Sequence, residues 1–276
     1  MSSPFQPVPD EPLAEPTPEI LTPARPPAAI PRESPVFGLL DVFLVFTSAL
    51  FLVLIVPALA VLTAHSLPRY AGVPLTTLAK NAVILVPGQT IAYLLLIAFV
   101  HMLMIARYDR SLAEAIPFAW PRERWVTLVG AGVALAFAIL LLGQFLPIPK
   151  QLPIDEFFKT RAAAFVMLAF GVLVAPLVEE LLFRGLLYPV LNRHLGVVAA
   201  LVLTSLGFAL LHASQLALAW APLLSLFLVG FALTLVRARF QSVAASTLVH
   251  MAYNATLLAI LYLQTGGFRN MDALTR

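Results

Sequence analysis

Seven apolar stretches follow one another along most of this chain, separated by short polar segments. Each has about the 20 apolar residues that a helix needs to cross a bilayer. They lie at 36–64, 81–106, 125–146, 162–189, 195–213, 218–236 and 243–264. The polar segment 147–161 is predicted to be an exposed loop or interfacial helix, or to hold an eighth half-span. The pattern therefore predicts an all-α, polytopic membrane protein with about seven to eight transmembrane helices.

The composition agrees with this interpretation. Hydrophobic residues make up 61% of the 276, charged residues only 11%, and the mean hydropathy is +0.93. A soluble domain is about a quarter charged. The net charge of +3 does not indicate nucleic-acid binding, because the basic residues fall mostly in the short loops between the stretches. The chain has no cysteine, which excludes disulfides and thiolate metal sites.

The first 35 residues differ in composition from the rest. They contain eleven prolines and five acidic residues, with no apolar run and no signal-peptide pattern. Such a segment cannot bury enough apolar surface to fold, so we predict a disordered Pro-rich tail over 1–35. We expect a first group of transmembrane helices over 36–161, a second region that carries the polar motifs over 162–264, and a short tail over 265–276.

The charges between the stretches favour one orientation by a small margin. With the amino terminus inside, the cytoplasmic side holds Arg25, Arg32, Arg107, Arg110, Arg122, Arg124, Arg193, Arg237 and Arg239. The opposite side holds Arg69, Lys80, Lys150, Lys159, Arg161, Arg269 and Arg276. The more basic side of a membrane protein usually faces the cytoplasm, so a cytoplasmic amino terminus is the expectation.

Three short polar patterns interrupt the apolar second half of the chain. They are EELLFR at 179–184, FALLH at 208–212 and HMAYN at 250–254. An ionisable side chain at the centre of a bilayer costs about 2.5–3.5 kcal/mol on insertion scales. Two carboxylates, a guanidinium and two imidazoles at this depth predict an active site buried in the membrane.

Helical spacing assigns different surroundings to the two glutamates. Glu180 and Arg184 are four residues apart, so they share a helix face and can neutralise each other. Glu179 points about 100° away and is left to face another partner. Pro176 removes one backbone hydrogen bond opposite the carbonyl of Val172. The resulting kink is expected to make room for water beside Glu179.

The histidines add a second and a third polar helix face. Phe208 shares a face with His212, and His250 shares one with Asn254, so three helices can meet at a common centre. Glu179, His212 and His250 would suffice to hold a catalytic zinc with its water. The same groups also work without metal. Glu179 would then take a proton from water that His212 orients, while His250 and Asn254 donate to the oxyanion.

A purely structural role is the alternative for each pattern by itself. Glu180 with Arg184 could be an internal salt bridge, and the other polar residues could join helices at about 1 kcal/mol or less per bond. The occurrence of all three patterns together favours a functional site, because clusters of ionisable groups inside membranes are functional by default.

Taken in order, EExxxR, FxxxH and HxxxN resemble the CPBP family. This family comprises the type II CAAX prenyl proteases, their bacterial homologues, and bacteriocin-processing and immunity relatives. The resemblance covers about residues 160–264, and the order of the motifs in successive spans makes it specific. It implies an all-α intramembrane endopeptidase whose catalytic residues are Glu179, His212, His250 and Asn254. The residues expected to support them are Glu180, Arg184 and Phe208.

The resemblance also implies a substrate class. Eukaryotic members remove the last three residues of prenylated CAAX proteins, so the expected partner is a membrane-anchored or lipidated peptide or protein in the lipid bilayer. Both the zinc mechanism and the metal-free glutamate mechanism have been proposed for the family, and the sequence leaves both open. The Ala-, Leu-, Pro- and Arg-rich composition is typical of a GC-rich bacterium. We therefore expect the bacterial cytoplasmic membrane and a substrate other than a prenylated CAAX protein.

Two other functions compete with proteolysis. A non-proteolytic bacteriocin-immunity or scaffold protein would keep the same fold, but it would not need the intact set of Glu179, His212, His250 and Asn254. A proton-coupled transporter could use the same groups as a relay. The lack of a recognisable internal repeat counts against the transporter.

Overall fold

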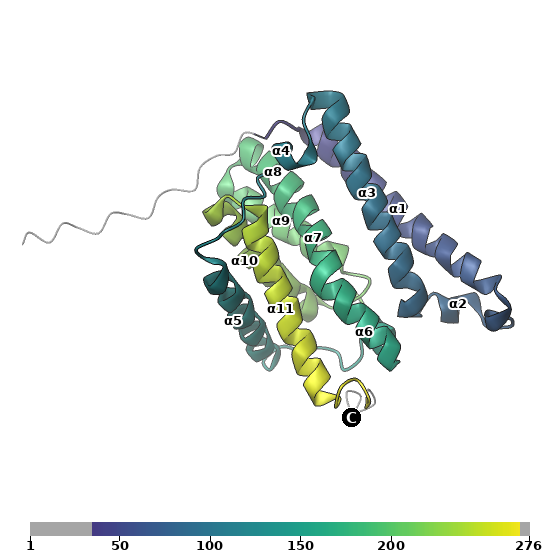
Figure 1. Cartoon of the computed structure of the whole chain (residues 1–276). Coiled ribbons are helices and arrows are strands. Elements are labelled where there is room, and N and C mark those ends of the chain that lie inside the picture. Colours follow the sequence, from purple (N-terminus) through teal and green to yellow (C-terminus); the bar gives the residue numbers. More distant parts are fainter. Residues whose placement is uncertain (1–34, 271–276) are drawn as a thin grey trace, which may run out of the picture.

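The computed structural model describes residues 35–270, and this part of the chain consists of helices and turns without a strand (Figure 1). Six helical segments are long and apolar enough to cross a membrane: Leu39–His65, Ala82–Tyr108, Trp125–Gly143, Arg161–Leu195, Trp220–Phe240 and Val243–Gln264. A seventh, Val197–Leu211, is apolar but shorter. The described chain is therefore an all-α polytopic membrane protein, as predicted. The tail predicted over 1–35 falls almost wholly outside the described residues, as does the end of the tail predicted over 265–276.

Helices α1 (Leu39–His65) and α3 (Ala82–Tyr108) form an antiparallel pair at one edge of the molecule (Figure 1). The short α2 (Leu75–Leu78) connects them, and α4 (Leu112–Ala115) follows α3. The buried carboxylate of Asp41 accepts the backbone N–H of Gly38 at 2.8 Å, which caps α1. It also pairs with Arg107 at 3.0 Å. Asp41 thus joins the ends of α1 and α3, in keeping with the structural role that its place near the helix start indicates.

The remaining long helices form the main bundle. Close approach through glycines fixes two of its contacts. On α5 (Trp125–Gly143), a Cβ added to Gly132 would collide with the carbonyl of Val249 on α11 (Val243–Gln264). On α10 (Trp220–Phe240), a Cβ on Gly230 would lie 3.2 Å from Cα of Ser205 on α9 (Val197–Leu211). Small residues let transmembrane helices approach closely, so these glycines set where α9, α10 and α11 stand around the polar motifs.

The fourth span is one continuous helical run that contains two π-helical segments. In order, it consists of α6 (Arg161–Ala169), the π-helical segment η3 (Phe170–Val174), α7 (Ala175–Glu180), the π-helical segment η4 (Leu181–Leu187) and α8 (Tyr188–Leu195). The kink expected at Pro176 takes the form of a π turn directly before the proline. Such turns are rare and frequently occur at functional sites.

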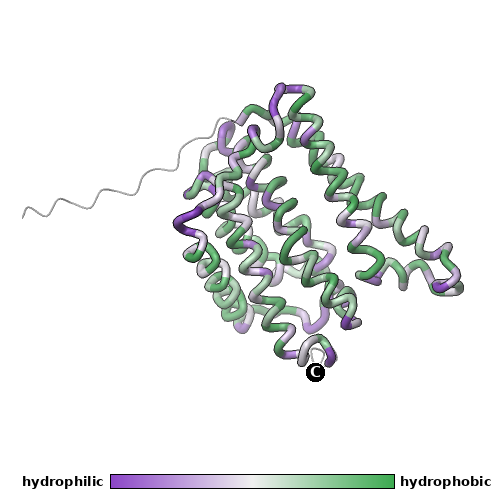
Figure 2. Tube along the Cα trace, in the orientation of Figure 1, coloured by the Kyte–Doolittle hydropathy of each residue, from purple (hydrophilic) through white to green (hydrophobic). Residues whose placement is uncertain are grey.

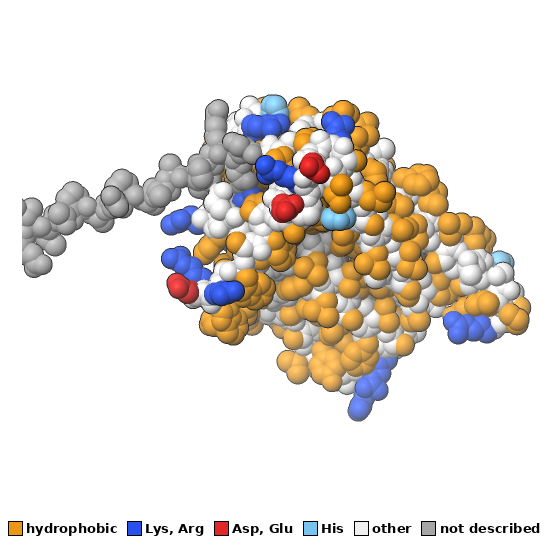
Figure 3. Space-filling view, turned by 45° about the horizontal axis from the view of Figure 1, so that its top comes forward, with side chains coloured by type: hydrophobic (Ala, Val, Ile, Leu, Met, Phe, Trp, Pro, Cys, Tyr) orange, Lys and Arg blue, Asp and Glu red, His pale blue; other side chains and the backbone are white. Residues whose placement is uncertain are grey.

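Polar residues gather at the two ends of the bundle, and apolar residues fill the zone between them (Figure 2). Figure 3 shows one of these ends, where arginines and carboxylates surround the start of the described chain. The segment 147–161 contains only the 3-10 helix η2 (Pro153–Phe158), so it is the expected loop, and within the described chain it holds no half-span. The start of α1 and the end of α11 lie at opposite ends (Figure 1), as an odd number of passes requires.

Candidate active site

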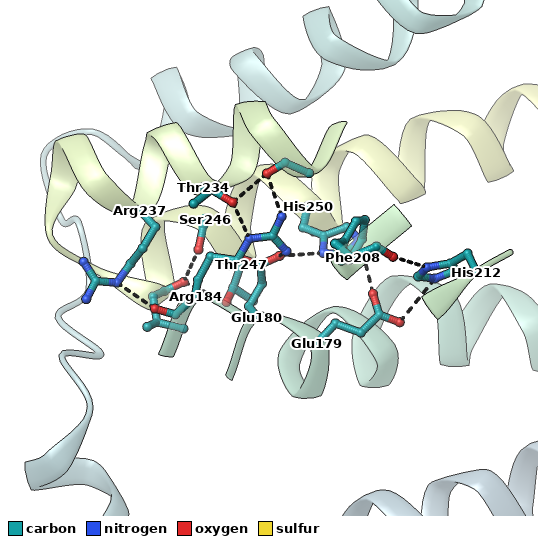
Figure 4. A network of polar contacts seen from close by, with 12 residues as sticks. Glu179, Glu180, Arg184, Phe208, His212, Thr234, Arg237, Ser246, Thr247 and His250 are labelled. Carbon is teal, nitrogen blue, oxygen red and sulfur yellow. Dashed lines mark hydrogen bonds and ion pairs between the residues drawn. The ribbon is translucent and has the colours of Figure 1, made fainter. Parts of the chain in front are cut away.

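The three polar patterns meet inside the bundle, where Glu179 faces both histidines (Figure 4). Glu179 lies near the end of α7, and its Oε1 is 3.9 Å from Nε2 of His212. Its Oε2 is 3.8 Å from Nε2 of His250, which lies on α11. Glu179 and His250 are both buried. The predicted common centre is therefore present in the structure.

The second glutamate belongs to the same network. Oε1 of Glu180 lies 2.8 Å from Nη1 of Arg184, which confirms the expected pair, and both side chains are fully buried. The same oxygen lies 3.0 Å from Nδ1 of His250. Glu180 thus does more than neutralise Arg184, because it also holds the imidazole of His250 in place. Carboxylates that bind one ring nitrogen in this way fix the tautomer and the orientation of the ring.

Arg184 ties the first motif to α10. Its Nη2 donates to the carbonyl of Gly230 at 2.8 Å, and its Nε donates to Oγ1 of Thr234 at 3.2 Å. The guanidinium also lies over the ring of Phe208, 4.6 Å from the ring centre. A buried cation is tolerated when its donors are satisfied in this way. Arg184 therefore fixes the position of the helix that carries the glutamates.

Phe208 separates the two imidazoles. Its ring centre lies 5.1 Å from that of His212 and 5.8 Å from that of His250. Phe183 also packs edge-on against Phe208, with 5.4 Å between the ring centres. The aromatic residue of the second motif is thus a spacer that sets the distance between the histidines.

His212 lies at the end of its helix and not inside it. The span was predicted over 195–213, but α9 ends at Leu211 and His212 is its C-cap. Nδ1 of His212 lies 3.0 Å from the carbonyl oxygen of Phe208. Because a carbonyl only accepts hydrogen bonds, we assign the ring proton to Nδ1, which leaves Nε2 as the acceptor facing Glu179. The same argument assigns the proton of His250 to the Nδ1 that faces Glu180.

Asn254 lies one turn beyond His250 and makes a different contact from the one expected. Its Nδ2 donates to the backbone carbonyl of Gly171 at 2.7 Å, in the π-helical segment η3. The side chain is therefore bonded to the helix that carries Glu179.

The donor types at the centre match those of a zinc site, since two imidazoles and a carboxylate are common zinc ligands. Their placement does not, because within the described chain no group of three or more His, Asp or Glu side chains is arranged to hold a metal ion. The carboxylate oxygens of Glu179 and the Nε2 atoms of His212 and His250 are all acceptors, and each oxygen lies 3.8–3.9 Å from the Nε2 that it faces. A molecule that offers protons to acceptors on several sides, such as water, suits this centre.

The sequence did not single out two residues that complete the site. Gly230 and Thr234 accept the hydrogen bonds of Arg184, and Thr234 is itself bonded to the Gly230 carbonyl at 2.7 Å. The signal that could have found them is the spacing of two small residues four apart on one face of a predicted transmembrane helix. The contact between Glu180 and His250 has no signal in the sequence, because it joins helices that are 70 residues apart.

Comparison with known proteins identifies this region. Residues 161–256 match the family model described as Type II CAAX prenyl endopeptidase Rce1-like. An uncharacterized 24.3 kDa protein of Escherichia coli is 29% identical to this chain over 188 residues, which are 66% of this chain and 82% of that protein. No solved structure matches the chain. The matched region contains all three polar motifs and every side chain of the network around Glu179. Residues 161–256 are thus similar to the Rce1-like type II CAAX prenyl endopeptidases, and this match supports the resemblance that the order of the three motifs indicates.

Proposed function

We propose that this protein is an intramembrane endopeptidase that hydrolyses a peptide bond near the membrane anchor of its substrate. The observation that carries the proposal is the buried carboxylate of Glu179 between the Nε2 atoms of His212 and His250. A carboxylate without a cation at hydrogen-bonding distance is suited to act as a base.

In the proposed reaction, a water molecule lies among these three groups. Glu179 takes one proton of the water, and the Nε2 of His212 accepts a hydrogen bond from its other proton. The water oxygen then forms a bond to the carbonyl carbon of the substrate, and the carbonyl π electrons move to its oxygen. When the C–N bond breaks, Glu179 returns the proton to the leaving amine. The products are a carboxylic acid and an amine, so one water is consumed for each bond broken.

His250 is the proposed partner of the developing oxyanion. Glu180 accepts the Nδ1–H of His250 at 3.0 Å and so fixes the orientation of the ring. When the ring also carries a proton on Nε2, which faces Glu179, that N–H can donate to the oxyanion. Arg184 pairs with Glu180 at 2.8 Å and holds its side chain in place. Asn254 supports the same centre through its bond to Gly171.

Zinc is the alternative to the metal-free mechanism. Glu179, His212 and His250 would be its ligands, and the metal would supply a more acidic water. Because the side chains as they lie are not arranged around a metal, the proposed steps use the protein groups alone.

The proposed substrate is a membrane-anchored or lipidated peptide or protein. Large apolar side chains are exposed along the whole length of the spans, so the protein meets lipid on its sides. A substrate held in the same bilayer can reach the centre by lateral diffusion. We place this multi-pass protein in a bacterial cytoplasmic membrane, in line with its composition and with the relative from Escherichia coli.

The test compares new peptide termini in the membrane proteome of a host that expresses the wild type, Glu179→Gln or Glu156→Gln. Glu156 is the matched control, since it lies in the loop before α6 and pairs only with lysines. Termini that the wild type and Glu156→Gln produce, and that Glu179→Gln does not, would identify the protease and its substrates. Identical proteomes for all three, with equal protection against a bacteriocin, would contradict the proposal and favour an immunity or scaffold protein.

A further inference from the structure

The helix that carries the glutamates contains the same unusual turn twice, once on each side of them. The turns span 170–176, with the sequence FGVLVAP, and 183–189, with the sequence FRGLLYP. In the first, the N–H of Ala175 donates to the carbonyl of Phe170. In the second, the N–H of Tyr188 donates to the carbonyl of Phe183. Both bonds span five residues, as in a π-helix, and a proline follows each directly.

This combination deprives one carbonyl in each turn of its backbone donor. For Gly171, the α-helical donor would be the N–H of Ala175, which is committed to Phe170. The π-helical donor would be residue 176, which is a proline and has no N–H. The carbonyl of Arg184 is in the same position with respect to Tyr188 and Pro189. A carbonyl without a partner inside a membrane protein is strongly unfavourable, so another group must supply the bond.

Side chains from two other helices supply these bonds. Nδ2 of Asn254 on α11 donates to the Gly171 carbonyl at 2.7 Å. Nε of Arg237 on α10 donates to the Arg184 carbonyl at 3.1 Å, a bond that can be followed in Figure 4. Each donor therefore meets the one carbonyl that the neighbouring π turn and proline leave without a helical partner.

We propose that Asn254 and Arg237 are positioning residues that hold the two π turns and thereby set the direction of the glutamates between them. A π turn holds one residue more than an α turn, and each residue of an α-helix turns by about 100°. Reversion of a π turn to α-helix would therefore rotate α7 by about that angle. Adjacent Glu179 and Glu180 also differ by about 100°, so the rotation would turn Glu179 away from the histidines.

This assignment differs from the metal-free mechanism predicted from the sequence, in which Asn254 donates to the oxyanion. The effect on catalysis rests on the proposed function. The hydrogen bonds by which Asn254 and Arg237 hold the two π turns, called the clamp below, do not rest on it. The two are therefore measured separately, by thermal unfolding of the full-length protein in detergent micelles and by proteolysis.

The unfolding experiment is a double-mutant cycle between each side chain and its proline. Asn254→Leu removes the side-chain donor, and Pro176→Ala returns a backbone N–H to the same turn. We expect Asn254→Leu to lower the unfolding midpoint by about 2–4 °C, the effect of one lost hydrogen bond in a chain of this size. In the Pro176→Ala background, Asn254→Leu should lower the unfolding midpoint by less than half of that amount, measured relative to Pro176→Ala alone. Equal losses with and without Pro176→Ala would overturn the clamp.

Two controls make the coupling specific. Asn254→Leu combined with Pro189→Ala should show no rescue, because that proline belongs to the other turn. Thr256→Val removes a hydroxyl that is bonded within α11 to the Ala252 carbonyl at 2.7 Å, so it should not couple to Pro176→Ala. Rescue in either control would contradict a local clamp. Arg237→Gln with Pro189→Ala is the reciprocal pair. The Asn254 cycle decides the proposal if the Arg237 variant does not fold.

The catalytic consequence is tested on a fluorogenic prenylated CAAX peptide, or on a peptide whose cleavage in the host depends on Glu179. We expect Asn254→Leu to lower kcat by about 10²-fold with KM nearly unchanged, as for a displaced catalytic group. Adding Pro176→Ala to Asn254→Leu should raise kcat again by at least about tenfold. If Pro176→Ala is active by itself but does not restore the kcat of Asn254→Leu, the result would contradict the positioning role and assign Asn254 to the oxyanion instead. A wild type that cleaves no such peptide and produces no Glu179-dependent termini in the host would contradict the proposed function and leave the unfolding cycle as the test of the clamp.

Discussion

Nδ1 of His250 lies 3.0 Å from Oε1 of Glu180, while Nε2 on the other side of the same ring faces Glu179. One imidazole therefore connects two adjacent carboxylates that have different surroundings. Glu180 is bonded to a cation and to a ring nitrogen, whereas Glu179 faces two more distant Nε2 atoms, at 3.8 and 3.9 Å. This difference supports the proposed division of roles, in which Glu180 is structural and Glu179 is the catalytic base.

Replacing each glutamate with glutamine is expected to have a different main effect, a loss of stability for Glu180 and a loss of cleavage for Glu179. Glu180→Gln leaves the charge of Arg184 buried without its partner and should reduce the free energy of unfolding by about 3–5 kcal/mol. Glu179→Gln removes no close ion pair and should change it by less than about 1 kcal/mol, while it abolishes cleavage. Chemical unfolding in micelles together with the peptide assay measures both effects. Similar destabilisation by both variants would contradict the assignment.

Phe208 is expected to act through the spacing of the histidines. Phe208→Leu keeps most of the buried volume, so the loss of stability should stay below about 1.5 kcal/mol. The cleavage rate should fall by about 10–100-fold, because the imidazoles lose the ring that separates them. Phe227→Leu is the matched control, since Phe227 pairs with Phe231 on α10 away from the histidines. Equal losses of activity in both variants would argue against a spacer.

Chelation separates the two mechanisms. If Glu179 activates water without metal, prolonged treatment with a strong zinc chelator should leave the cleavage rate within about twofold of the untreated rate. Loss of at least 90% of activity, restored by added zinc, would instead assign Glu179, His212 and His250 as metal ligands. Metal analysis of the purified protein before and after chelation is the accompanying measurement.

Gly132 is expected to control the position of α11 and therefore of His250. A Cβ there would collide with the carbonyl of Val249 and would lie 2.6 Å from Cβ of Ala252. Gly132→Ala should therefore reduce stability by about 1–3 kcal/mol and lower the cleavage rate. Gly130 has nothing within 4 Å of an added Cβ, so Gly130→Ala should be neutral or slightly stabilising. A neutral Gly132→Ala would contradict the close contact between α5 and α11.

Much of this molecule can be predicted from the sequence because the bilayer imposes simple rules. A span needs about 20 apolar residues, so the apolar stretches located the long helices to within a few residues, apart from the fourth, which continues to Leu195. Side chains four apart share a helix face, which correctly paired Glu180 with Arg184. The ionisable residues stood out because so few occur inside spans, and their order indicated the family whose model matches residues 161–256.

The tertiary structure decided what depends on contacts between distant segments. The second bond of Glu180, to His250, joins helices that no local rule connects. The end of α9 at Leu211 depends on the cap that His212 forms with Phe208, which the hydropathy of the stretch does not reveal. The proline pattern predicted an interruption of the fourth span at Pro176, but not its π form, because the sequence does not show which side chain of another helix can donate to the released carbonyl. Here that donor is Asn254, and it is supplied by the packing of α11 against the fourth span.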